Sequence, residues 1–266
     1  MSNCYFFKEI NYNNGILDNC IDATYIIHLE GNGRINHIQE QLSNFQPSKT
    51  LFILFNKGYK NCCKESYINK SQLDLVDAFL QIFKHANYLN YNNILILEDD
   101  FIFNKEIKNK EIPERINNFI NKQTNKNLVY ALGLIPIFQF PVNLYTNYVA
   151  IGAGTHAIIY TNEIRKTILD IPISDINDWD GFLNRFNINK FSYYRPLCYQ
   201  LFPVTENSNN WFSKNINLII RKIIILLKLD IQCEPGYTIC YILSISIIFI
   251  IFIILYLIIK KIKYKI

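Results

Sequence analysis

The stretch that decides the fold is Asn93–Phe103, with the sequence NILILEDDFIF. Its apolar run, Ile94–Leu97, has the composition of a strand buried inside a sheet. Three carboxylates follow directly, at Glu98, Asp99 and Asp100. Because open α/β sheets bind ligands at the carboxyl ends of their strands, this position predicts a ligand site.

Three neighbouring acids repel one another, and a bound cation relieves that repulsion. Carboxylate oxygens suit Mn²⁺ or Mg²⁺, which can also bridge a diphosphate. In an extended chain Glu98 and Asp100 lie on one side and Asp99 on the other. We therefore predict Glu98 and Asp100 as metal ligands.

Two alternatives compete for this acidic strand end. One is a solvated acidic turn that follows a core strand and binds nothing. The other is a receiver domain of the response-regulator type, which carries a similar Mg²⁺-binding strand end. In receiver domains that strand opens the domain, whereas here other strands and helices precede it.

Strands and helices alternate along the chain, which predicts a mostly parallel sheet covered by helices on both faces. We expect strands at 23–29, 50–55, 93–97, 128–132, 149–151 and 156–160, with a Gly-rich turn between the last two. We expect helices at 35–42, 71–87, 114–123 and 162–169, with Ser71 as the N-cap of the second. Residues 1–20 are predicted to form an N-terminal extension.

The composition fits a globular domain with a membrane element. The chain has 266 residues, of which 50% are hydrophobic and 18% charged, and this excludes a mainly disordered protein. The net charge is +5, and the basic residues gather near the C-terminus beside apolar segments. That distribution favours phospholipid head groups over nucleic acid as the anionic partner.

The seven cysteines are irregularly spaced and include no CxxC pair. This pattern argues against a zinc site. We expect reduced, mostly buried thiols in a reducing compartment.

Residues 237–259 contain no charged residue, and Lys260 and Lys261 follow them. An uncharged run of this length predicts one transmembrane helix. A buried core helix is the alternative. The N-terminus lacks the pattern of a secretory peptide, so we expect a tail-anchored protein, with its domain in the cytosol and residues 260–266 as a basic tail.

Residues 213–236 form a juxtamembrane segment. Within it, the charges of Lys214–Leu229 fall inside about 120° of one helical face. Such a basic amphipathic helix can lie flat on an anionic membrane. A last domain helix packed on the sheet is the alternative, and the sequence does not separate the two.

Several motifs, taken in chain order, resemble the glycosyltransferase family 25 group, which includes lipooligosaccharide and collagen galactosyltransferases. They are Tyr25–Leu29 with Arg34, NILILEDDFIF, Gly154–Tyr160, Ile176–Leu183, and Tyr199-Gln200 to Thr205. The resemblance covers 21–210, nearly all of the predicted domain 21–212. Two departures are that His28 stands where the family has Asn, and that the family's Ser-His before the acidic strand is missing.

The resemblance implies a GT-A-like (Rossmann-like) fold and an inverting hexosyl transfer from a UDP-sugar, such as UDP-galactose or UDP-glucose, to a hydroxyl. The acceptor would be a glycan, a protein or a lipid, and the cofactor Mn²⁺ or Mg²⁺. Carried over residue by residue, Glu98 and Asp100 match the metal motif with Asp99 alongside. Tyr25, His28, Arg34 and His156 match positions at the donor site.

The acceptor hydroxyl must lose its proton during transfer, and a positioned carboxylate can take it. We predict Asp180 for this role and Asp178 as the second choice. The alternative is that Asp180 is the N-cap of a helix over 181–186. Trp179 beside it could stack on a sugar or belong to the core.

The sequence thus predicts a metal-dependent, membrane-anchored glycosyltransferase. A non-catalytic, membrane-tethered relative that binds a nucleotide or glycan is the alternative, which the altered first motif would permit.

Overall fold

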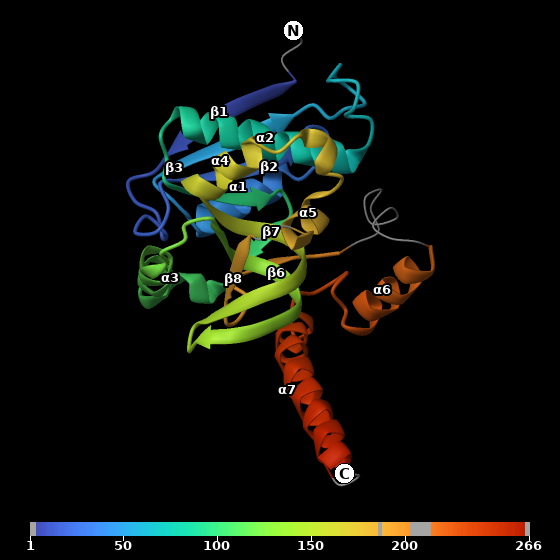
Figure 1. Cartoon of the computed structure of the whole chain (residues 1–266). Helices are drawn as coiled ribbons and strands as arrows, with labels where there is room; N and C mark the ends of the chain where they lie inside the picture. The colour runs from blue at the N-terminus through green and yellow to red at the C-terminus, as the bar shows by residue number, and fades with distance from the viewer. Residues whose placement is uncertain (1–3, 186–187, 203–213, 264–266) are drawn as a thin grey trace.

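The computed structural model describes residues 4–185, 188–202 and 214–263. It confirms a mixed α/β fold with a mostly parallel central sheet (Figure 1). The seven strands lie in the order β1-β3-β2-β4-β7-β6-β8. Their bounds are β1 Tyr5–Asn11, β2 Ala23–Leu29, β3 Thr50–Asn56, β4 Asn93–Glu98, β6 Leu128–Asn143, β7 Thr146–Thr161 and β8 Asn189–Tyr193.

The strand pairings give the sheet its direction. β2 is parallel to both β3 and β4, and β6 is parallel to β8. β7 is antiparallel to β4 and to β6, so β6 and β8 run the same way as β2, β3 and β4. Only β1 and β7 run against them among the strands of this sheet in the described residues.

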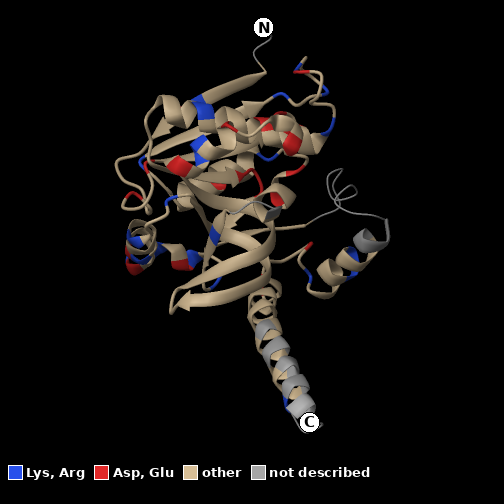
Figure 2. Cartoon of the chain, in the orientation of Figure 1, with Lys and Arg blue, Asp and Glu red and all other residues tan. Residues whose placement is uncertain are grey.

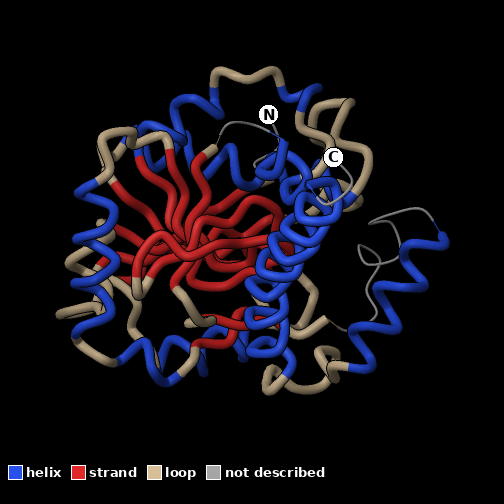
Figure 3. The backbone as a smooth tube through the Cα atoms, turned by 60° about the horizontal axis from the view of Figure 1, so that its bottom comes forward, coloured by secondary structure: helices blue, strands red, loops and turns tan. Residues whose placement is uncertain are grey.

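Helices cover both faces of the sheet (Figure 3). Alternating side chains of each strand feed two cores: in β4, Leu95 and Leu97 face one, and Ile94 and Ile96 the other. The first core is closed by α1 and α3, and the second by α2, α4 and α5. These helices are α1 Ile35–Asn44, α2 Ser71–Tyr88, α3 Glu111–Lys122, α4 Asn162–Leu169 and α5 Trp179–Arg185.

The N-terminal residues differ from the sequence prediction. Instead of an extension outside the domain, they include β1, which pairs with β3 from Tyr5 to Asn11 and forms an edge of the sheet. Ser71 also differs, because it is the first residue of α2 and the N-cap position is Lys70.

The Gly-rich turn predicted after Ile151 is absent. β7 runs without interruption from Thr146 to Thr161 and forms a long hairpin with β6. The register between the two strands shifts at several points, and Gly154 adopts φ +64°. Irregular pairing of this kind lets one strand pass through a segment that looks like a turn in the sequence.

The C-terminal part begins with a small second sheet, in which β5 (Phe101–Phe103) pairs with β9 (Cys198–Gln200). Two helices follow, α6 (Lys214–Leu226) and α7 (Gly236–Lys263). Across the residues that the structure describes, no helix offers an apolar stretch long enough to cross a membrane. The predicted transmembrane segment therefore stays a prediction.

Many apolar side chains of α6 are exposed, as at Leu218, Ile219, Ile223 and Leu226, while Ile224 packs against a small cluster of buried residues, Tyr199, Leu229, Tyr237 and Tyr241. The juxtamembrane role of this segment stays a prediction. The basic tail after Lys263, together with residues 203–213, lies outside the described residues.

One prediction about the cysteines is wrong. Cys4 and Cys62 form a disulfide that joins the start of β1 to the loop after β3. Cys20 and Cys198 are buried thiols, as expected. Disulfides persist in oxidising compartments, so this bond does not fit a fully reducing environment.

Candidate functional site

The candidate site lies where β2 and β4 end together. These neighbouring strands are parallel, and Ile27 pairs with Glu98. The loop after β2 and the acidic turn after β4 therefore emerge at the same edge of the sheet. This juxtaposition is what the acidic strand end predicts.

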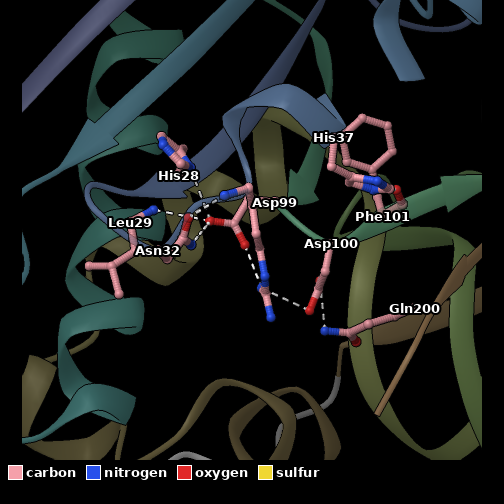
Figure 4. A network of polar contacts seen from close by, with 9 residues as sticks. His28, Leu29, Asn32, His37, Asp99, Asp100, Phe101 and Gln200 are labelled. Carbon is pink, nitrogen blue, oxygen red and sulfur yellow. Dashed lines mark hydrogen bonds and ion pairs between the residues drawn. The ribbon is translucent and has the colours of Figure 1, made fainter. Parts of the chain in front are cut away.

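Asp99 is the centre of a hydrogen-bond network (Figure 4). Its Oδ2 accepts hydrogen bonds from the backbone N–H of Leu29 (3.1 Å) and from the Asn32 amide (2.5 Å). His28 Nδ1 lies 3.2 Å from the same oxygen, and Arg34 Nη1 donates to Oδ1 at 2.6 Å. Asp99 thus fastens the end of β2 and the loop 30–34 to the end of β4.

The charge on Asp99 is strongly stabilised. Burial alone would raise the pKa of this carboxyl, but the contacts with His28, Arg34 and Asn32 outweigh burial and lower it. Asp99 is therefore held as an anion by donors inside the protein, and these contacts hold the site together.

Asp100 has fewer partners. Its Oδ2 lies 3.0 Å from Arg34 Nη1, and its Oδ1 accepts a hydrogen bond from the Gln200 amide at 2.9 Å (Figure 4). The prediction that Asp99 and Asp100 lie on opposite sides fails, because β4 ends at Glu98 and residues 99–100 form a turn. One guanidinium therefore reaches both carboxylates.

Gln200 is positioned by the start of α7. The hydroxyl of Tyr237 accepts a hydrogen bond from the Gln200 backbone N–H (2.9 Å) and donates one to its carbonyl (3.0 Å). Tyr237 itself is fully buried. A contact chain thus leads from α7 through Gln200 to Asp100.

Glu98 is the acid whose ionisation its surroundings oppose most strongly. Burial raises its pKa well above the ordinary value, and the charges on Asp100, Asp180 and Asp99 raise it further, while Arg34 lowers it. Burial also raises the pKa of Asp100, against the effect of Arg34. Arg34 alone therefore does not offset the effect of burial and of the neighbouring carboxylates on the pKa of Glu98 and Asp100.

This donor set fits a hard divalent cation. Mg²⁺-type ions are commonly held by one or two carboxylates, with water and substrate phosphates completing the coordination. Glu98 and Asp100 could supply those two carboxylates. Among the described residues, no three or more His, Cys, Asp or Glu side chains are arranged as a complete protein site.

Asp180 and Asp178 have different roles in α5. Asp178 is the helix cap, since its Oδ1 accepts a hydrogen bond from the backbone N–H of Gly181 at 2.6 Å. Asp180 reaches across to β7, where it accepts hydrogen bonds from Gly154 N–H (2.7 Å), Thr155 N–H (3.1 Å) and the Thr155 hydroxyl (2.6 Å). The N-cap alternative considered for Asp180 is thus wrong.

A buried lysine accompanies Asp180. Lys190 is 1% exposed and donates a hydrogen bond to Asn184 of α5. Burial lowers the pKa of Lys190 to about 8, although the charge of Asp180 acts in the opposite direction.

Four residues considered for ligand contact are buried. Tyr25 is completely buried, and its hydroxyl lies 2.9 Å from His85 Nδ1. His156 is also completely buried, with its ring nitrogens at the carbonyls of Gly154 (2.6 Å) and Cys198 (3.2 Å). Burial lowers the pKa of His156 to about 4.

His28 is 4% exposed and serves the Asp99 network. Trp179 stacks on Phe79 with ring centroids 4.2 Å apart and donates to the Tyr160 hydroxyl. Of the two alternatives for Trp179, the structure therefore supports a place in the core. In this structure these buried side chains offer no surface to a ligand.

Sequence reasoning missed Asn32, Lys190 and Tyr237. Asn32 had a usable signal, because a Gly-Asn-Gly turn directly after a strand often presents a polar side chain at the strand end. The other two had none, since Lys190 lies in a short strand and Tyr237 opens an apolar run.

Comparison with known families gives no assignment. No family model matches the chain, and no curated protein matches it. The family 25 resemblance therefore stays a prediction.

Three solved structures show partial similarity, each at 12% sequence identity. One is a glycosyltransferase involved in the glycosylation of the major capsid of PBCV-1 (TM-score 0.41; 69% of this chain and 93% of that chain). Another is a protein from STIV (TM-score 0.42; 69% and 86%). A third is a candidate glucose-1-phosphate thymidylyltransferase from Bacillus anthracis (TM-score 0.29; 80% and 79%). Similarities of this size do not establish an activity.

Proposed function

We propose that this chain is a glycosyltransferase that moves a sugar from a UDP-sugar to a hydroxyl of a glycan, protein or lipid, with inversion at the sugar carbon. The observation that carries the proposal is the clustering of Glu98 and Asp100 with Arg34 at the carboxyl end of β4. Such an edge of an α/β sheet is where nucleotides bind.

The leaving group of this reaction is a diphosphate, so the site must bind a concentrated negative charge. Glu98 and Asp100 would hold Mn²⁺ or Mg²⁺, which when bound supplies Lewis-acid stabilisation of that charge. Arg34 adds a permanent cation, and its side chain is about one-third exposed. A planar guanidinium can donate hydrogen bonds to phosphate oxygens in pairs.

The acceptor hydroxyl needs a base, for which Asp180 is our proposal. Its Oδ1 accepts two hydrogen bonds from Thr155, whereas its Oδ2 accepts one from Gly154. A carboxylate oxygen has two acceptor positions, so Oδ2 keeps one for the proton of the acceptor. The charge of Asp180 raises the pKa of Glu98, so the proposed base interacts electrostatically with the acidic centre.

Membrane attachment through residues 237–259 belongs to the same proposal. What supports it is the sequence of α7, which contains no acidic residue and carries its lysines at the C-terminal end. An acceptor carried on a lipid would then lie within reach of the site.

The decisive experiment is turnover of UDP-sugars by the full chain, with Mn²⁺ and after chelation. Asp100→Asn should abolish metal-dependent turnover and weaken UDP binding. Asp170→Asn, the same change at an exposed acid after α4, is the matched control and should behave as wild type. UDP binding without turnover of any UDP-sugar would favour the non-catalytic alternative. If UDP does not bind, both readings of the site fail.

A further inference from the structure

The β6–β7 hairpin extends beyond the sheet and ends in an apolar tip. Buried residues fill the first half of β6, whereas its last residues are mostly exposed. Phe140, Val142 and Tyr145 are among the exposed apolar side chains, and Leu144 at the turn is 83% exposed. An exposed cluster of large apolar side chains marks an interaction surface.

The hairpin also lacks charge. From Asn127 to Thr161 the chain contains no Asp, Glu, Lys or Arg, and the ribbon of the hairpin carries no charged residue in Figure 2. Much of this stretch is buried in the sheet, where charge is not expected, but the exposed end of the hairpin, from Phe140 to Tyr145, carries no charge either. The absence of charge fits insertion into a medium where ions are costly.

Two arginines and a second tyrosine gather at Tyr145, the last residue of the tip. The Arg115 guanidinium lies 3.8 Å from the centroid of the Tyr145 ring, and that of Arg195 lies 5.0 Å from the Tyr194 ring. The two tyrosines meet at 6.1 Å. Amphipathic rings and long basic side chains are enriched at the boundary between lipid and water.

These arginines also pair with Glu111 and Glu106, so they add little net charge. The positive charge comes from α6, whose residues Lys214–Leu226 include three basic side chains and no acidic one. α6 therefore supplies the attraction to anionic lipids that the hairpin lacks.

The hairpin, α6 and α7 lie toward the same end of the molecule (Figure 1). Gln139 in β6 ties the hairpin to α7, because its amide donates a hydrogen bond to the Ser244 hydroxyl at 2.8 Å. Beside and beyond that contact α7 exposes Leu243, Ile247 and Ile250. Three elements from distant parts of the chain thus form one apolar end.

We propose that the hairpin tip, Phe140–Tyr145, inserts into the lipid–water interface of an anionic membrane and is a second attachment point beside α6 and α7. This inference rests on the membrane attachment proposed above, but not on the catalytic activity. A second copy of the chain is the competing occupant. A lipid surface fits better because the uncharged tip and the basic helix α6 lie on either side of α7, at the end of the molecule from which α7 extends (Figure 1).

The test uses the full chain reconstituted into phosphatidylcholine vesicles that contain phosphatidylserine. Leu144→Trp places a fluorescent reporter at the tip. Tyr88→Trp is the matched control, because Tyr88 is 82% exposed at the end of α2. The wild-type emission is subtracted from both. Replacing part of the lipid with brominated phosphatidylcholine should quench the Leu144→Trp emission by about half or more, since interfacial side chains reach the acyl boundary. The Tyr88→Trp emission should not change.

Absence of quenching at position 144 in a chain that floats with the vesicles would overturn the proposal. A blue shift without quenching would overturn it too, because protein, and not lipid, would then cover the tip. Failure of the full chain to float with the vesicles would contradict it as well. Matching melting temperatures for both variants and the wild type establish that the reporters leave the fold intact.

Discussion

Tyr237 holds both backbone polar groups of Gln200 with one hydroxyl. The two residues come from α7 and β9, and the side chain of Gln200 continues the contact to Asp100. The first turn of α7 is thus connected to the acidic centre through two side chains.

Tyr237→Phe should therefore weaken the site from a distance. Loss of the hydroxyl leaves two buried backbone groups without this partner, at a cost of about 1–3 kcal/mol in unfolding free energy. We expect donor turnover to fall and to require more Mn²⁺, because Gln200 no longer orients Asp100. Both are measured by titrating Mn²⁺ at a temperature where the variant is folded.

Tyr241→Phe is the matched control for this prediction. It lies one helical turn further along α7, is equally buried, and its hydroxyl has no hydrogen-bond partner among the described residues. Its removal should leave turnover and stability unchanged or slightly raise stability. Equal effects of both substitutions would show that α7 influences the site only through packing and not through the Tyr237 hydroxyl.

Asp99→Asn should destabilise the fold more than the corresponding substitution of any exposed acid. It removes the charge that faces Arg34 and sets an amide against the donors at Leu29 and Asn32, so we expect a loss of about 3 kcal/mol. Chemical denaturation measures this loss. Glu111→Gln, which breaks the exposed pair with Arg115, should leave the denaturation midpoint nearly unchanged.

The lowered pKa of Asp99 also determines how the stability of the fold changes at acid pH. Folding lowers the pKa of Asp99, so its stabilisation is complete above the unfolded value near 4 and disappears as the pH falls through the folded value. Between pH 4 and 2 the wild type should lose stability more steeply than Asp99→Asn. Parallel curves for the two proteins would contradict the assignment.

Asp180 and Asp178 can be separated by the same isosteric change. Asp178→Asn should cost only a few tenths of a kcal/mol, because Asn caps helices about as well as Asp. Asp180→Asn turns an amide N–H toward N–H groups of β7 and should cost about 1–3 kcal/mol. If Asp180 is the base, turnover should also fall by ~10²-fold or more at a temperature where the variant is folded. A loss of turnover only in Asp178→Asn would assign the proton to Asp178.

Because Lys190 titrates at a lower pH in the folded protein, the free energy of unfolding should rise with pH in the alkaline range. Its pKa falls from 10.5 to about 8 on folding, so the unfolded chain binds more protons between these values and stability rises with pH there. The full difference is on the order of 3 kcal/mol. Other groups titrate in the same range, so the measurement is the difference between wild type and Lys190→Met. Lys8→Met, at an exposed lysine of β1, should keep the wild-type slope.

Local pattern was sufficient for the centre of the fold. β2, β3 and β4 carry continuous apolar runs, and α2 has apolar residues at helical spacing, so their positions follow from the sequence within a residue or two. β7 was not predictable, because its glycines indicate a turn while pairing with β6 keeps the strand extended. β1 gave no signal either, since only its pairing with β3 makes it a strand.

For the site, the sequence predicts the place but not the roles. Parallel strands that end together bring Arg34 to the acids, and this follows from the order of the elements. The division of labour between Asp99 and Asp100 depends on the turn after Glu98, which alternation along a strand does not describe. The contact from Tyr237 joins segments with no local relationship, so only the assembled structure reveals it.

The partners of Asp99 also bear on how the protein folds. All of them lie between 65 and 71 residues away along the chain. Contacts of such separation close a long loop, so they form only after β2 and β4 have come together. Until then the loop 30–34 keeps only its local hydrogen bonds and its contact with β3. A newly made chain would therefore complete this edge of the sheet late in its assembly.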